Sequence, residues 1–202
     1  MIFLLERLVF MIPLVLSLAV HEWAHAFAAY KLGDDTAKAM GRMTLDPLAH
    51  IDWVGTVALP LIGVPFGWAK PVPINPVRFD SRFSMTTGML ISAAAGPVSN
   101  MVLAALAIAI RVALADVLPA HMLDLLDWTW MLNISLGVFN LLPVSPLDGS
   151  RIVDGLIPRK WSGKWDEFSR YGPYILVGIL ALPMVIGLSL FAPFVDLMQL
   201  FP

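Results

Sequence analysis

Two histidines and a glutamate lie inside an apolar stretch of the sequence, AVHEWAHAFAAY, at residues 19–30. On a helix, His21 and His25 are four residues apart, so both imidazoles project from one face and can ligate one ion. In His-Glu-x-x-His sites of this kind the ion is zinc, and the glutamate, here Glu22, is the general base. The spacing therefore predicts a zinc site with hydrolytic chemistry. The alternative is a polar cluster at a membrane surface, since Lys31 follows closely.

A catalytic zinc site needs a third protein ligand and leaves its fourth position to water. The candidates are His50, His121 and the acidic residues, most of which lie in expected loops. Asp148 is favoured, because it lies in the segment NLLPVSPLDG, whose prolines end a helix. Gly149 then permits a sharp turn that could aim the carboxylate inward. A plain turn aspartate is the alternative interpretation.

The elements that must position these residues are expected to be membrane helices. The chain has 202 residues, of which 58% are hydrophobic and 14% charged, which is typical of an integral membrane protein. It has no cysteine, so disulfides and thiolate chemistry are excluded. A spanning helix needs ~20 mostly apolar residues. The sequence predicts an all-α polytopic membrane protein with about four such helices, at residues 8–30, 85–114, 127–147 and 171–198.

A fifth apolar stretch, residues 54–69, is shorter and is interrupted by prolines and glycines. It predicts a re-entrant or extended membrane-associated segment near residues 54–75. If this stretch enters and leaves on one side, all basic residues except Arg7 and Arg111 lie on that side, which is 11 of 13. The positive-inside rule makes that side cytoplasmic, and the metal motifs lie toward it.

Four segments together resemble the site-2 protease family of intramembrane zinc metalloproteases. They are HEWAH, NLLPVSPLDG, GWAKPVPIN at residues 67–75 and AAAGPVSN at residues 93–100. The last two are similar to segments of the compact prokaryotic branch, without PDZ or CBS domains. The resemblance implies one zinc ion per chain, held by His21, His25 and Asp148, with Glu22 as the base. Ser150, where many members have glycine, is a departure that affects the turn and not ligation.

From this resemblance we expect a zinc-dependent metalloendopeptidase, a hydrolase of the cell membrane. It would cleave peptide bonds in or next to transmembrane segments of membrane proteins, as in regulated intramembrane proteolysis. The chain is expected to form one membrane-embedded domain, residues 1–202, with its active site toward the cytoplasm. Two other classes remain open. A metal-ion transporter would need polar ligands on both sides of the membrane midplane, and an inactive scaffold or chaperone would have no use for Glu22.

Several other residues have two interpretations. Asn140 could hold an oxyanion during peptide hydrolysis, or could make an interhelical hydrogen bond. The segment GWAKPVPIN is expected to be extended, with alternating side chains, and either pairs with an unwound substrate strand or serves as a connector. The small residues at 93–99 favour close helix packing, which is preferred over a role for Asn100 beside a metal ligand. His50 is expected at the membrane interface.

Overall fold

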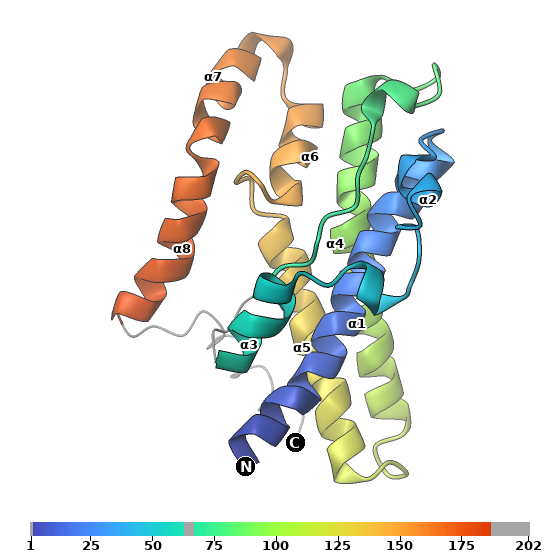
Figure 1. Ribbon diagram of the computed structural model, residues 1–202, viewed down its shortest axis with the longest axis vertical. Coiled ribbons are helices and arrows are strands. Elements are labelled where there is room, and N and C mark those ends of the chain that lie inside the picture. Colours follow the sequence, from blue (N-terminus) through green and yellow to red (C-terminus); the bar gives the residue numbers. More distant parts are fainter. Residues whose placement is uncertain (1, 63–66, 187–202) are drawn as a thin grey trace.

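Three long helices form the centre of the molecule (Figure 1). The computed structural model describes residues 2–62 and 67–186. Helix α4 packs against both α1 and α5, and also against α6, so it is the central element. The bounds are Ile2–Lys31 for α1, Met85–Ala113 for α4, Ala120–Asn140 for α5 and Asp148–Leu156 for α6.

The remaining elements are also helical. Helices α7 and α8 follow α6 and are Arg159–Arg170 and Gly172–Ile186. The shorter helices α2 and α3 are Thr36–Ala39 and Leu59–Ile62, with single helical turns at Pro47–Ala49, Trp53–Ala58 and Pro76–Arg78. No strand occurs in either described range, so the expected all-α class is confirmed.

Within residues 2–62 and 67–186, two helices have the length and composition to cross a membrane, at Leu8–Lys31 and Met85–Ala113. They match the first two expected spans, at 8–30 and 85–114. The third expected span, 127–147, is misplaced, because α5 begins seven residues earlier, at Ala120, and ends at Asn140. Helix α8 begins where the fourth span, 171–198, was expected, but residues 187–198 lie outside the described part of the chain.

A buried ion pair explains why the start of α5 was missed. The Arg111 guanidinium on α4 pairs with the Asp127 carboxylate on α5, and the two side chains are only 13% and 10% exposed. The Trp130 indole N–H donates to the same carboxylate at 2.9 Å. The charge of Asp127 is thus compensated inside the helix pair, beside a core of Ala104, Ala107 and Trp130. The expected span began at Asp127 itself, so it left out the first turns of α5.

The segment between α2 and α4 matches the expected re-entrant or extended region. It is helical from residue 53 to residue 62 and extended over residues 67–75, lying beside the middle of α1 (Figure 1). The extended part is tied to the chain at several points. The N–H groups of Lys70 and Asn75 donate to the His50 carbonyl and the Asp34 carboxylate, at 2.9 and 2.6 Å. Pairing with a substrate strand stays a prediction that would use its remaining backbone groups.

The expected alternation in this segment is wrong in part. Trp68 and Lys70 are exposed, but Val72, which was expected on the same side, is buried. The reason is that Val72 packs with Ala26 of α1 and Ala37 of α2. The proline on each side of it prevents regular strand geometry, so the side chains do not follow a period of two.

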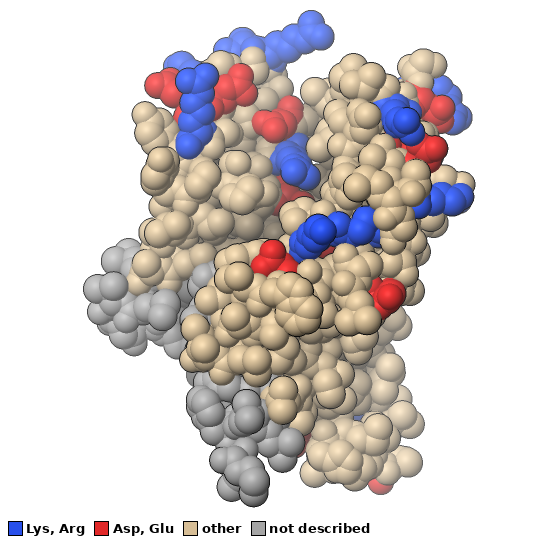
Figure 2. Space-filling model, in the orientation of Figure 1, with Lys and Arg blue, Asp and Glu red and all other residues tan. Residues whose placement is uncertain are grey.

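Charged side chains gather at one end of the molecule. In the view of Figure 2, Lys and Arg lie over the upper half, and the surface below them is almost entirely uncharged. The upper end holds α2, α7 and the start of α4 (Figure 1). On the face shown in Figure 2, the basic side chains thus gather at one end above a mostly uncharged body, as the positive-inside rule expects of a membrane protein.

Candidate metal centre

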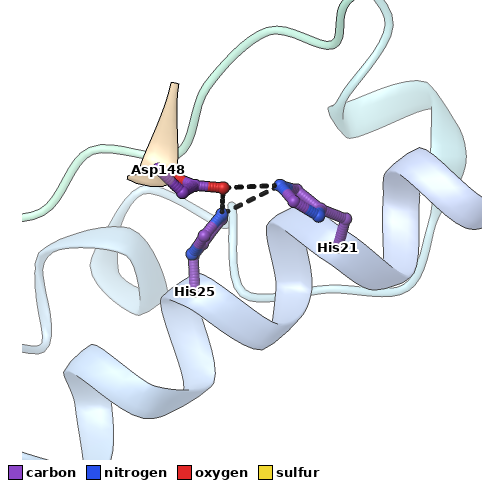
Figure 3. A group of neighbouring side chains, drawn as sticks. All are labelled: His21, His25 and Asp148. Carbon is purple, nitrogen blue, oxygen red and sulfur yellow. Dashed lines mark hydrogen bonds and ion pairs between the residues drawn. The ribbon is translucent and has the colours of Figure 1, made fainter. Parts of the chain in front are cut away.

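Three ligand atoms from two distant parts of the chain meet at one point. His21 and His25 come from α1, and Asp148 is the first residue of α6 (Figure 3). The Asp148 Oδ2 atom is 3.2 Å from the Nε2 atom of each histidine. The two Nε2 atoms are 3.0 Å apart, and all three side chains are buried. The predicted metal ligands are therefore neighbours, although His25 and Asp148 are 123 positions apart in the chain.

Close approach of α4 shapes the site. A Cβ atom added at Gly96 of α4 would lie 2.4 Å from His25 Nε2 and 2.6 Å from His21 Cε1. Only a residue without a side chain fits there. The expectation that small residues at 93–99 allow close helix packing is confirmed. At Gly96, the groups that pack against α4 are the two imidazoles of α1.

The hydrogen-bond partners of the histidines define their tautomers. His25 Nδ1 is 2.7 Å from the Ser92 carbonyl oxygen, which can only accept, so His25 carries its hydrogen on Nδ1. His21 Nδ1 is 2.6 Å from the Asn100 Oδ1 atom and donates to it. Each neutral imidazole therefore presents the lone pair of its Nε2 atom to the centre. Two lone pairs and a carboxylate oxygen converge, with no donor among them.

Such an arrangement of acceptors fits a bound cation. Three electron-rich atoms within 4.8 Å of one another repel unless a positive charge lies between them. Two imidazole nitrogens and one carboxylate oxygen are a donor set typical of catalytic zinc. Burial alone would raise the pKa of Asp148, but the two imidazoles beside it hold the pKa well below its usual value. The carboxylate is thus ionised and ready to ligate.

Gly149 has a different role from the one that was expected. It does not adopt a left-handed conformation, since the positive backbone angles in the described chain are at Gly33 and Gly41. A Cβ atom at Gly149 would lie 2.3 Å from the carbonyl oxygens of Leu141 and Leu142. Gly149 therefore lets the start of α6 pack against the end of α5, which places Asp148. Ser150 donates its hydroxyl hydrogen to the Leu147 carbonyl at 2.8 Å.

Glu22 lies beside the cluster and is held by the extended segment. Its Oε2 atom accepts a hydrogen bond from the Val72 N–H at 2.8 Å, and the side chain is buried. The carboxylate is therefore oriented by a backbone group and not by another side chain. One oxygen is used by this contact, which leaves the other to act on a proton.

Other residues considered from the sequence lie elsewhere. His50 is buried, and its Nε2 atom is 2.9 Å from the Thr44 carbonyl, outside the metal cluster. His121 is exposed near the start of α5. Asn140 is half-buried and donates to the Leu136 carbonyl of its own helix at 3.0 Å. This hydrogen bond lies within α5, so it is not the interhelical bond that was considered, and it does not reach the metal cluster.

The preference for packing over a polar role at Asn100 is wrong. Asn100 is fully buried and contacts His21 directly. Its Nδ2 atom donates to the Oδ1 atom of Asn133, a residue that sequence reasoning missed, at 2.7 Å. Asn133 in turn donates to the Ser17 hydroxyl at 2.8 Å. Ser17 is four residues before His21 and therefore on the same helix face, which was the available signal.

Comparison with known proteins agrees with this site. The model of peptidase family M50 matches residues 109–181, a range that includes Asn140 and Asp148. The chain is 41% identical to "Putative zinc metalloprotease YwhC" of Bacillus subtilis, over 86% of this chain and 80% of that protein. It is 28% identical to "Putative zinc metalloprotease Rip2" of Mycolicibacterium smegmatis, over 84% of this chain and 65% of that protein. No solved structure gives a significant match.

The helical fold and the buried histidine and aspartate cluster define a membrane metallopeptidase. The chain belongs to peptidase family M50, the site-2 proteases. The expected class, a zinc-dependent metalloprotease with zinc as its cofactor, is confirmed. The comparisons give no support to a metal-ion transporter or an inactive scaffold.

Proposed function

We propose that this chain hydrolyses peptide bonds in or next to transmembrane segments of membrane proteins, with one zinc ion held by His21, His25 and Asp148. The observation that carries the proposal is the convergence of two imidazole nitrogens and one carboxylate oxygen at 3.0–3.2 Å in a buried site. A cation bound among these three atoms offsets their mutual repulsion in a buried site.

The residues of the chain divide the chemistry among them. A zinc ion bound here supplies Lewis-acid polarisation and lowers the pKa of water. Glu22 accepts a proton from the attacking water and passes it to the leaving amine. The Val72 N–H fixes the orientation of the Glu22 carboxylate. Asn140 uses one hydrogen of its amide on the Leu136 carbonyl and has a second to offer an oxyanion.

The membrane arrangement is part of the proposal. We infer four spans, formed by α1, α4, α5 and the segment that begins with α8, in a single membrane-embedded domain of the cell membrane. The charged end of the molecule faces the cytoplasm, because it carries most of the basic residues (Figure 2). The metal cluster then opens toward the cytoplasmic side, from which water enters. Cysteine-accessibility labelling at engineered positions in α2 and in the α4–α5 loop would test this orientation.

Zinc content of detergent-purified protein tests the site before any substrate is known. We expect about one zinc per chain in the wild type. His25→Ala and Asp148→Ala should each lose most of it, because a ligand is gone. His50→Ala is the matched control, since His50 is a buried histidine outside the cluster, and it should retain zinc. Retention of zinc in Asp148→Ala would contradict the proposed ligand set.

A further inference from the structure

A chain of buried amides connects His21 to the interior of α5. His21 Nδ1 meets Asn100 Oδ1 at 2.6 Å, Asn100 Nδ2 meets Asn133 Oδ1 at 2.7 Å, and Asn133 Nδ2 meets the Thr129 carbonyl oxygen at 2.8 Å. Asn133 also donates to the Ser17 hydroxyl. The side chains of Asn100 and Asn133 are completely buried, so water cannot substitute for any of these partners.

The direction of this chain is fixed at its far end. The Thr129 oxygen is a backbone carbonyl, which accepts and never donates. Asn133 must therefore turn its NH₂ group toward α5 and its Oδ1 atom toward Asn100. The Ser17 hydroxyl can donate or accept, so it adapts to either orientation of the Asn133 amide and does not determine it.

The same direction then passes to the histidine. Because Asn133 offers an oxygen, Asn100 must turn its NH₂ group toward Asn133 and its Oδ1 atom toward His21. His21 must then carry its hydrogen on Nδ1, which leaves the Nε2 lone pair facing Asp148. An inverted Asn100 would force the hydrogen onto Nε2, where it would point at Asp148 and block a cation.

The tautomer of His25 is fixed without a second amide, in contrast to that of His21. Its Nδ1 atom donates directly to the Ser92 backbone carbonyl at 2.7 Å, an acceptor that cannot be inverted. The acceptor of His21 is a side-chain amide, which has two orientations of equal shape. A second amide is what makes one orientation stable.

We propose that Asn133 is a positioning residue for the metal site: it fixes the orientation of Asn100 and, through it, the tautomer in which His21 can ligate zinc. This inference rests on the proposed function for its purpose, but the tautomer itself is a property of the metal-free protein. The hydrogen bonds of Asn133 go to Asn100, Ser17 and the Thr129 carbonyl, and not to a proposed metal ligand. Its effect passes through Asn100, and it uses neutral amides throughout, so no charge is buried at membrane depth.

Nitrogen NMR of metal-free protein with ¹⁵N-labelled histidine tests the inference directly. The chain has four histidines, and the His21 signals are identified by their loss in His21→Gln. We expect the wild type to carry hydrogen on Nδ1 of His21. In Asn133→Leu, Asn100 loses its fixed acceptor, so both tautomers of His21 should be populated. Hydrogen on Nε2 of His21 in the wild type would overturn the inference without any variant.

Zinc affinity by chelator competition gives the second measurement. Loss of an outer hydrogen-bond partner weakens metal binding by roughly 10- to 100-fold, and we expect a loss of that size in Asn133→Leu. Ser99→Ala is the matched control, because Ser99 is next to Asn100 but donates to the Gly96 carbonyl of its own helix. It should leave both the tautomer and the affinity unchanged.

A rescue separates positioning from simple packing. Asn100→Asp presents only acceptors, so in that variant His21 keeps its Nδ1 hydrogen whatever Asn133 does. Adding Asn100→Asp to Asn133→Leu should therefore restore the tautomer and most of the zinc affinity. The inference is overturned if Asn133→Leu changes neither measurement, or if the double variant is no better than Asn133→Leu. A wild type with the expected tautomer but no zinc binding would overturn the proposed function alone.

Discussion

The backbone N–H of Val72 donates to the Glu22 carboxylate at 2.8 Å, which joins the extended segment 67–75 to the residue proposed as general base. The segment is held on its other side by Arg42, whose guanidinium donates to the Lys70 carbonyl at 2.6 Å. The orientation of Glu22 thus depends on a segment that crosses α1, and not on α1 alone.

Removal of this N–H group should lower turnover without loss of zinc. Val72→Pro deletes the donor, whereas Val72→Ala keeps it and shortens the side chain. A hydrogen bond to a charged group contributes about 1.5–3 kcal/mol, so we expect turnover to fall about 10- to 100-fold in Val72→Pro. Cleavage of a membrane substrate in detergent, with zinc content measured on the same samples, checks this. Equal activity of the two variants would show that the contact does not position Glu22.

Glu22→Gln should abolish proton transfer and leave the metal site intact. An amide cannot accept the proton, and loss of a general base costs about 10²–10⁴-fold in rate. Zinc content should remain near that of the wild type, because Glu22 is not part of the ligand cluster. Turnover within a few-fold of the wild type would exclude Glu22 as the base.

Gly96→Ala should disrupt the metal centre from the opposite helix. The new methyl group would lie 2.4 Å from His25 Nε2, so either α4 or the imidazole must move. Overpacking of this kind costs about 1–3 kcal/mol, and we expect zinc affinity to fall about 10-fold or more. Gly178→Ala on α8, where the added atom would meet nothing within 4 Å, is the control. Unchanged zinc binding in Gly96→Ala would show that the helices separate easily there.

The grouping of the three proposed ligands was predictable because each carries a strong local signal in the sequence. The spacing of His21 and His25 on one helix face needs no tertiary information. Asp148 was selected because prolines end the helix before it and because it was expected at the same side of the membrane as the two histidines. The order of the helices along the chain was enough to predict that placement. Asn133 and Ser17 could not be assigned in this way, because a single buried polar residue has no periodic signal. Their partners are set by how α1, α4 and α5 pack.

The start of α4 was predictable because Ser84, a good N-cap residue, stands just before the apolar run. Helix bounds were not predictable where a charge is neutralised by a residue far away in sequence. Asp127 on α5 pairs with Arg111 on α4, which neutralises its charge. Helix α5 therefore begins at Ala120, before Asp127, although the expected span began at Asp127. The burial of Val72 was missed for a related reason, since it depends on contacts with α1 and α2.

Asn140→Ala tests the proposed oxyanion role. Removing one oxyanion donor typically lowers turnover by about 10²–10³-fold, and we expect a loss in that range. Zinc content should be normal, because the Asn140 amide bonds to the Leu136 carbonyl and is not in the cluster. Thr129→Ala is a suitable comparison, since its hydroxyl also donates within α5, to the Leu125 carbonyl. If both variants keep full turnover, Asn140 has only a structural role in its helix.

Loss of one partner of the ion pair between α4 and α5 should lower the free energy of unfolding more than loss of both partners. Asp127→Ala leaves the Arg111 guanidinium without its carboxylate in a site where both side chains are nearly buried, and we expect a loss of about 3–5 kcal/mol. The double variant Arg111→Met and Asp127→Leu removes both charges and keeps apolar volume, so its unfolding free energy should lie within ~1 kcal/mol of the wild type, or above it. Denaturant unfolding in detergent micelles measures both. A double variant as unstable as Asp127→Ala would mean that the Trp130 hydrogen bond to Asp127, and not the ion pair, holds the two helices together.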